Sequence, residues 1–106
     1  MPETLLVGVW SAPGVRLVAT TEGAAFEKEC VVGRTKHEIA LDSAGSFSVQ
    51  GTWMALSGTD PIVSNVRYSG RVRGEVLELS IYFNNGVPFT VRYTLREGDR
   101  QLTRCQ

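Results

Sequence analysis

Apolar and polar residues alternate with a period of two along most of the chain, which is the pattern of half-buried β-strands. The clearest case is residues 66–83, where two alternating runs flank Gly74-Glu75. A glycine at the first central position fits a two-residue type II′ hairpin. This turn puts the apolar residues of both strands on one face and places Arg67 opposite Tyr82 on the other.

A second hairpin is predicted around DSAGS, residues 42–46, because a three-residue loop with glycine third is a type I turn closed by a bulge. Pairing Asp42 with Ser46 sets His37 opposite Gly51. A third alternating run covers residues 88–96, and its polar side chains share one surface with those of the hairpin at 66–83.

Turn signals recur about every ten residues, and no stretch has the length and period of a helix. The predicted strands are 5–10, 15–21, 25–32, 36–42, 46–55, 62–73, 76–83, 88–96 and 101–105. We therefore expect an all-β fold with a single domain over residues 1–106, a small antiparallel up-and-down β-barrel in which hairpin follows hairpin. Closure is favoured because it removes the exposed edges of a large twisted sheet. A β-sandwich is the alternative.

The charge pattern argues against a nucleic-acid partner. The formal net charge is zero, with 11 basic and 11 acidic residues. Residues 66–106 are basic and residues 1–65 are acidic, but a dedicated nucleic-acid domain is usually basic overall. The chain also lacks the roughly 20 consecutive apolar residues of a membrane helix, and its first residues lack the basic start of a signal peptide. We expect no membrane span.

Two cysteines, Cys30 and Cys105, are too few for a zinc site built from paired cysteines, and His37 is a lone histidine. We expect no metal and no cofactor. A disulfide between the cysteines would close a loop of about 76 residues and stabilise the fold by about 4 kcal/mol in the chain-entropy model. The alternative is two reduced thiols in a cytoplasmic protein.

We expect no enzymatic activity. His37 has Glu38 and Asp42 nearby in sequence, but no nucleophile elbow accompanies them. Glu27 and Glu29 fall on the same side of one predicted strand, which is typical of a solvated face rather than of paired catalytic carboxylates.

Two binding surfaces remain as hypotheses for function. The first is a small apolar ligand in the barrel mouth or interior, contacting Trp53, Tyr68, Tyr93 and His37, with room left at Gly51 and Gly70. The predicted inward aromatic residues are Phe26, Phe47, Trp53, Tyr68, Phe83, Phe89 and Tyr93. The second is a protein-interaction or inhibitor module that uses the exposed Arg67, Tyr82 and Arg92. The oligomeric state, monomer or homodimer, is left open.

The chain also resembles known barrels. Gly8-Val9-Trp10 on the first strand, with Arg104 on the last, resembles the signature of the calycin group of lipocalin-like barrels, in which a basic side chain covers the tryptophan. A closer resemblance, to an uncharacterised family of small secreted bacterial proteins and lipoproteins, rests on five segments in order: GVW, FEKEC, IALDSAGSFSVQGTW, VRYSGRVRGEVLELSI and FTVRYTLREGDRQLTRC. The resemblance implies an extracytoplasmic (periplasmic or secreted) barrel with a disulfide between Cys30 and Cys105 and no assigned chemistry.

Overall fold

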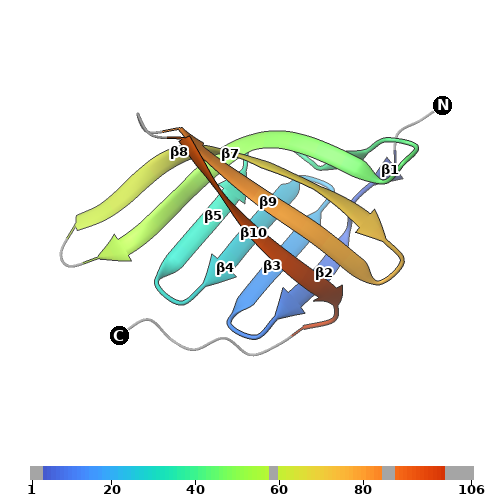
Figure 1. Cartoon of the computed structure of the whole chain (residues 1–106), viewed down its shortest axis with the longest axis horizontal. Helices are drawn as coiled ribbons and strands as arrows, with labels where there is room; N and C mark the ends of the chain where they lie inside the picture. The colour runs from blue at the N-terminus through green and yellow to red at the C-terminus, as the bar shows by residue number, and fades with distance from the viewer. Residues whose placement is uncertain (1–3, 58–59, 85–87, 100–106) are drawn as a thin grey trace.

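The computed structural model describes residues 4–57, 60–84 and 88–99 (Figure 1). These ranges contain strands and connecting turns, and none of them forms a helix. The strands are β1 (Thr4–Leu5), β2 (Gly8–Ala12), β3 (Val15–Thr20), β4 (Gly23–Lys28), β5 (Val31–Thr35), β6 (Ala40–Leu41), β7 (Ser46–Ser57), β8 (Asp60–Arg73), β9 (Val76–Asn84) and β10 (Pro88–Glu97).

Eight of these strands form a closed antiparallel barrel in the order β10-β2-β3-β4-β5-β7-β8-β9. Each strand pairs with the next barrel strand along the chain, and β10 returns to pair with β2. The predicted all-β up-and-down barrel is therefore confirmed, and the sandwich alternative is wrong. Strands β1 and β6 form a separate two-stranded sheet.

The hairpin of β8 and β9 has the predicted register. Val72 pairs with Leu77, and Arg67 pairs with Tyr82. Gly74 has a φ of 58°, and Glu75 does not share this positive φ, as a type II′ turn requires. The alternating apolar residues of both strands are buried accordingly, from Val66 and Tyr68 on β8 to Leu77, Leu79, Ile81 and Phe83 on β9.

The prediction was wrong between residues 25 and 42. The expected strand 25–32 is interrupted by a tight turn at Glu29-Cys30, in which Lys28 pairs with Val31 and Cys30 has a φ of 59°. The next barrel strand is β5, so the neighbour of Gly51 is Thr35 and not His37. Of the expected strand 36–42, only β6 has strand structure.

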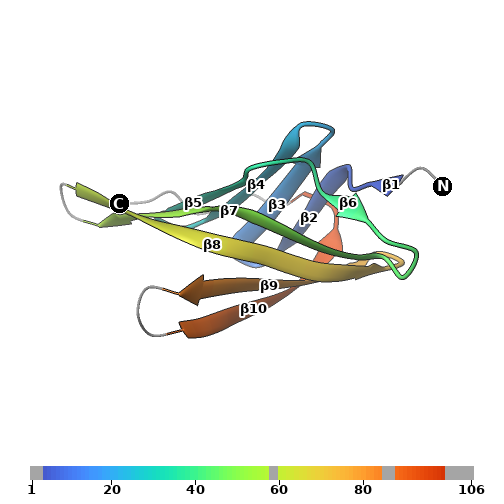
Figure 2. The ribbon, with the colours of Figure 1, turned by 90° about the horizontal axis from the view of Figure 1, so that it is seen from above.

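The turn at residues 42–46 forms as predicted, with the Asp42 amide donating to the Ser46 carbonyl over 3.0 Å and Gly45 at a φ of 80°. The segment before it crosses the end of the barrel instead of joining its wall. There the Leu6 amide donates to the Ile39 carbonyl over 2.8 Å, and both side chains are buried. Leu6 and Ile39 belong to the core, and the β1–β6 sheet lies at the opposite end from the C-terminal end of β7 (Figure 2).

Strand β10 closes the barrel against β2 through a short seam. Two residue pairs join them, Arg96 with Ser11 and Glu97 with Trp10. In addition to these two pairs, Ser11 Oγ donates to the Gly98 carbonyl over 2.6 Å. The hydroxyl of this buried serine therefore has a hydrogen-bond partner. The expected strand 101–105, with Arg104 and Cys105, lies outside the described residues, as does the proposed cover over Trp10.

Candidate functional site

The middle of the barrel is filled by Tyr68. This side chain is 1% exposed, and its hydroxyl donates to the Thr52 carbonyl over 2.5 Å. Burial raises the pKa of Tyr68 above its ordinary value. The tyrosine that was predicted to bond a ligand therefore has its hydroxyl engaged by the backbone.

Two glycines provide the space that the Tyr68 ring occupies. A Cβ at Gly33 would lie 2.0 Å from the tyrosine hydroxyl, and a Cβ at Gly51 would lie 2.7 Å from the ring. Gly70, the other expected opening, is covered as well, because a Cβ there would lie 2.2 Å from the Glu78 carbonyl oxygen. The positions where the sequence pattern left room, Gly51 and Gly70, are therefore filled.

One end of the barrel leaves inward-facing apolar side chains in solvent. On β8, Ile62 faces the same side as its partner Ala55 and is 61% exposed. On β10, Phe89 lies opposite the buried Phe83 and is 50% exposed. The β7–β8 and β9–β10 hairpins diverge at this end (Figure 2). Ile62, Phe89 and the half-buried Val31 and Ala55 are called the open end below.

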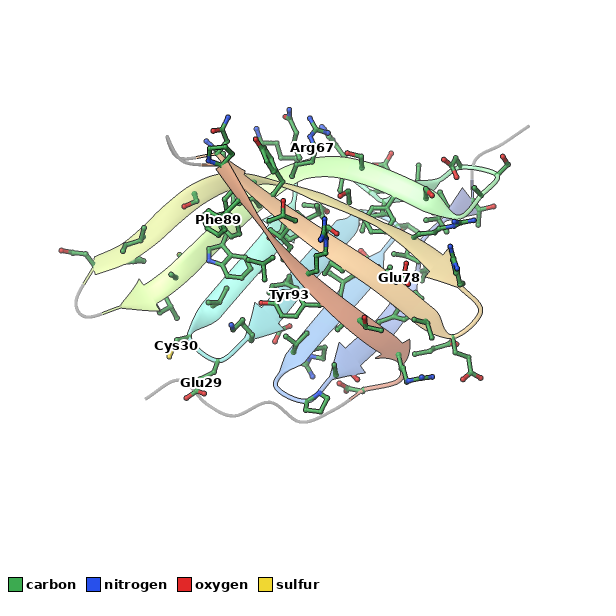
Figure 3. All side chains as sticks on the ribbon, in the orientation of Figure 1. Glu29, Cys30, Arg67, Glu78, Phe89 and Tyr93 are labelled. Carbon is green, nitrogen blue, oxygen red and sulfur yellow. The ribbon has the colours of Figure 1, made fainter. Side chains whose placement is uncertain are left out.

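Aromatic rings connect the open end with the core. Phe89 stacks on Phe83 with ring centres 4.5 Å apart, and Phe83 meets the edge of Trp53 at 5.1 Å. Trp53 stacks on Phe26 at 5.4 Å, and Phe26 lies 5.4 Å from Tyr93. Phe26 is fully buried, so the row runs from solvent to the centre of the molecule. Figure 3 labels Phe89 and Tyr93, the two rings that β10 contributes to this row. Phe89 contacts Phe83, and Tyr93 contacts Phe26.

The predicted ligand-binding residues are therefore divided among three places. Trp53 and Tyr93 lie in the aromatic row behind the open end, whereas Tyr68 is locked in the core. His37 is exposed and lines a shallow hollow on the outer surface with Glu38 and Arg67. His37 was misplaced because the register of the 36–42 segment was wrong.

The predicted partner-binding residues do share the outer face. Arg67 lies opposite Tyr82, and Arg92 lies opposite Ser80 on the next strand pair. All three side chains are exposed, and Arg67 stands out at the edge of the molecule in Figure 3. The guanidinium of Arg67 reaches toward β7, where Nη1 donates to Ser48 Oγ over 3.0 Å.

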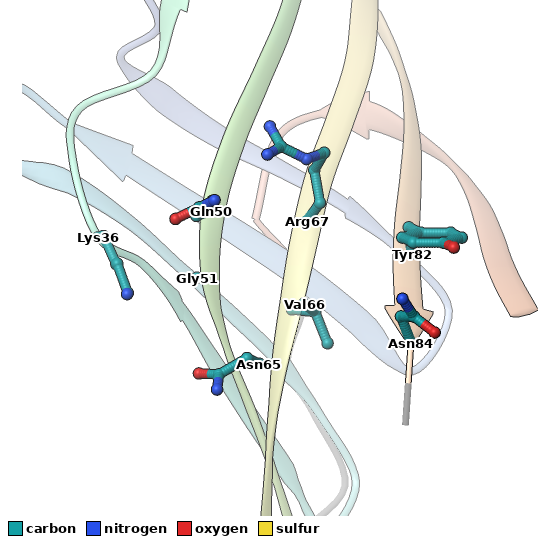
Figure 4. A pocket seen from close by; sticks show the side chains of 8 residues that line it. All are labelled: Lys36, Gln50, Gly51, Asn65, Val66, Arg67, Tyr82 and Asn84. Atoms are coloured by element: carbon teal, nitrogen blue, oxygen red, sulfur yellow. The ribbon is translucent and has the colours of Figure 1, made fainter. Parts of the chain in front are cut away.

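A shallow groove runs along this outer face (Figure 4). Its rim carries Gln50, Arg67 and Tyr82 along one cross-strand row and Asn65 and Asn84 along the next. Lys36 stands at the β7 side of the groove, and the backbone of Gly51 and Val66 lies between the two rows.

Charged side chains elsewhere form structural contacts. Arg16 bridges Glu27 at 2.9 Å and Asp99 at 3.0 Å on the outer surface. Glu29 lies at the β4–β5 turn beside Cys30 (Figure 3), so it does not extend the strand of Glu27 as predicted. Among the described residues, no three His, Cys, Asp or Glu side chains gather in a way that could hold a metal ion. None of the described ranges forms a helix with the length and hydropathy that a bilayer crossing needs.

Comparison of the chain with protein-family models, with curated proteins and with solved structures gives no match. The resemblance to secreted lipocalin-like proteins, and the extracytoplasmic location that it implies, therefore stay predictions. The pairing of Cys30 with Cys105 also stays a prediction, because Cys105 lies outside the described residues.

Sequence reasoning placed Phe89 and Phe83 inside the barrel but did not single out Ile62. Strand parity was the available signal, since the β7–β8 register puts Ile62 on the same face as Tyr68. Its exposure depends on how far the β7–β8 hairpin extends beyond its neighbours, and the sequence pattern gives no measure of that distance.

Proposed function

We propose that the protein is a non-catalytic binding module that holds a small apolar ligand at the open end of its barrel. The observation that carries the proposal is the exposure of two inward-facing apolar side chains, Ile62 and Phe89, the second of which stacks on the buried Phe83. Inward positions of a barrel are normally removed from water, because burying an apolar side chain of this size stabilises the fold by about 1.5–3 kcal/mol. A ligand that covers them recovers this free energy.

The other end of the barrel supports the choice of site. Leu6 and Ile39 are buried there and belong to the core, so these two apolar side chains are already covered by the protein itself. Tyr68 blocks the middle. The ligand is therefore small and lies against Ile62 and Phe89 without passing through the barrel.

The size of the contact sets the expected affinity. A phenylalanine buries about 150–250 Å², so covering the exposed half of Phe89 removes about 100 Å² from water and contributes about 2.5 kcal/mol. Burial of the exposed part of Ile62 and stacking of the ligand on the Phe89 ring add about 2 kcal/mol to the binding free energy. Burial of the ligand's own apolar surface adds to this sum. After the cost of association, we expect a Kd of about 1–100 µM.

A matched pair of variants tests the site. Ile62 and Val63 are adjacent on β8, are each 61% exposed and face opposite sides of the strand. The neutral fluorescent probe N-phenyl-1-naphthylamine is titrated into the wild-type chain and into Ile62→Thr and Val63→Thr. We expect saturable binding that Ile62→Thr weakens by about fivefold, a loss of about 1 kcal/mol, and that Val63→Thr leaves nearly unchanged.

Two results contradict the proposal. Absence of saturable binding by the wild-type chain rules out the apolar site for a probe of this class. Equal weakening by both variants shows that the probe adheres to the hairpin as a whole, because Val63 does not face the open end.

A further inference from the structure

We propose that the outer groove along β7, β8 and β9 is a second binding site, separate from the open end, and that it takes a uronic acid residue of a saccharide. The groove is open to solvent and has a volume of about 350 Å³, at the lower end of the range of small-molecule sites. It is lined by Lys36, Gln50, Gly51, Asn65, Val66, Arg67, Tyr82 and Asn84 (Figure 4).

The charge of the groove selects an anion. Lys36 and Arg67 line it, and no acidic side chain does. Ser48 accepts one hydrogen bond from Arg67, and the other guanidinium nitrogens have no acceptor among the described residues. A guanidinium presents donors in a planar fork that fits the two oxygens of a carboxylate. A carboxylate is therefore the anion that this groove fits best.

The neutral polar side chains select a sugar over a simple anion. Gln50, Asn65 and Asn84 place three amide groups around the groove, and no hydrogen bond to another described residue engages them. Each amide both donates and accepts hydrogen bonds, as each sugar hydroxyl does. A chloride or acetate ion has no donors to offer these carbonyl oxygens.

Tyr82 adds an apolar surface at the β9 side of the groove, with 40% of its area exposed. Its ring can cover the C–H face of a pyranose while the phenol oxygen stays in water. The Arg67 guanidinium reaches toward Ser48 on β7, on the side of β8 away from Tyr82.

The strand arrangement disfavours an acidic peptide. Extended peptides are usually bound by adding a strand to a free sheet edge. At the groove, β7 is paired with β5 and β8, and β9 is paired with β8 and β10. Between the two rows of the groove the backbone is paired, Gly51 with Thr35 and Val66, and Val66 with Phe83. An extended peptide cannot add a strand at that point, so side chains meet the ligand, which suits a sugar ring.

The test is a nuclear magnetic resonance titration of the labelled chain with digalacturonic acid, lactose, acetate and a glutamate-rich peptide. We expect saturable shifts of groove residues with digalacturonic acid in the millimolar range and binding at least about tenfold weaker with the other three. Lactose lacks the carboxylate, whereas acetate and the peptide lack the sugar hydroxyls. Equal binding of acetate would show an adventitious anion site, and equal or tighter binding of lactose or the peptide would overturn the uronic acid assignment.

Variants of the same strand and face complete the test. Arg67→Gln removes the guanidinium from the groove, and Arg73→Gln removes the same charge from an exposed position at the β8–β9 turn. We expect Arg67→Gln to weaken the binding of digalacturonic acid by about tenfold and Arg73→Gln to change this affinity by less than about twofold. Equal effects would mean that overall charge alone draws the ligand, and no saturable shift in the wild-type chain would overturn the site.

Discussion

Replacing Gly33 with alanine tests whether the Tyr68 side chain fills the barrel. A Cβ at this position would lie 2.0 Å from the Tyr68 hydroxyl and 3.1 Å from the Thr52 carbonyl oxygen, so the tyrosine must move. Overpacking of this kind typically costs about 1–3 kcal/mol. The more restricted unfolded chain of an alanine variant offsets about 0.4–1 kcal/mol of that loss. We expect the free energy of unfolding to fall by about 1–2 kcal/mol.

The double variant Gly33→Ala with Tyr68→Phe makes the test specific. Tyr68→Phe alone loses one buried hydrogen bond, worth about 1 kcal/mol. In the double variant the nearest tyrosine-derived atom is the ring carbon at 3.2 Å, so most of the overlap disappears. The stability lost in the double variant should therefore be smaller than the sum of the two single losses by about 1 kcal/mol or more.

Urea denaturation followed by tryptophan fluorescence measures all the variants, with a constant slope confirming two-state unfolding. Gly51→Ala is the control, because its Cβ would also lie 2.2 Å from the Arg34 backbone carbonyl oxygen, which Tyr68→Phe cannot relieve. Additivity of Gly33→Ala and Tyr68→Phe, or a neutral Gly33→Ala, would refute the reasoning. The interior would then have room for a ligand, and the open end would lose its place as the preferred site.

Two further predictions concern ionisation and the cysteines. Burial raises the pKa of Tyr68 above its ordinary value of 10.0, so the stability linked to this group is fully present below about pH 10 and is lost as the pH rises further. Above pH 10 the free energy of unfolding of the wild-type chain should fall more steeply than that of Tyr68→Phe, by up to about 1.4 kcal/mol per pH unit, and parallel curves in alkaline urea titrations would contradict this. For Cys30 and Cys105 we predict a disulfide, so intact mass spectrometry after alkylation without reductant should find no modified thiol; two alkylated thiols would show the reduced form.

The fold could be predicted well wherever a turn residue marked the hairpin. Gly74 and Gly45 both adopt positive φ, and the strands around them have the expected registers. The Glu29-Cys30 turn was missed because Cys30 enters the left-handed region without being a glycine, an asparagine or an aspartate. The wrong strand at 36–42 followed from that missed turn.

Gly33 shows why a local signal misled. Glycine is typical of turns, but Gly33 lies inside β5 and leaves space for a side chain from β8. Such a requirement arises from two strands that are far apart in sequence, so no local pattern reports it.

The candidate sites were only partly predictable for the same reason. Strand parity placed Arg67, Tyr82 and Arg92 on one outer face, as the structure shows. The same parity placed Tyr68 inside the barrel but could not show that its hydroxyl is engaged by Thr52. The burial of Tyr68 and the shape of the outer groove depend on how strands that are distant in sequence pack against one another.

The short seam between β2 and β10 also governs the order in which the barrel can be completed. The hydrogen bond from Ser11 to Gly98 joins residues 87 positions apart, and the seam pairs are of the same long range. Contacts of such separation form late, because a large loop of chain must be ordered first. On a ribosome, β2 therefore keeps an unpaired edge until β10 has been synthesised, and the growing meander is most open to association with other chains during that interval.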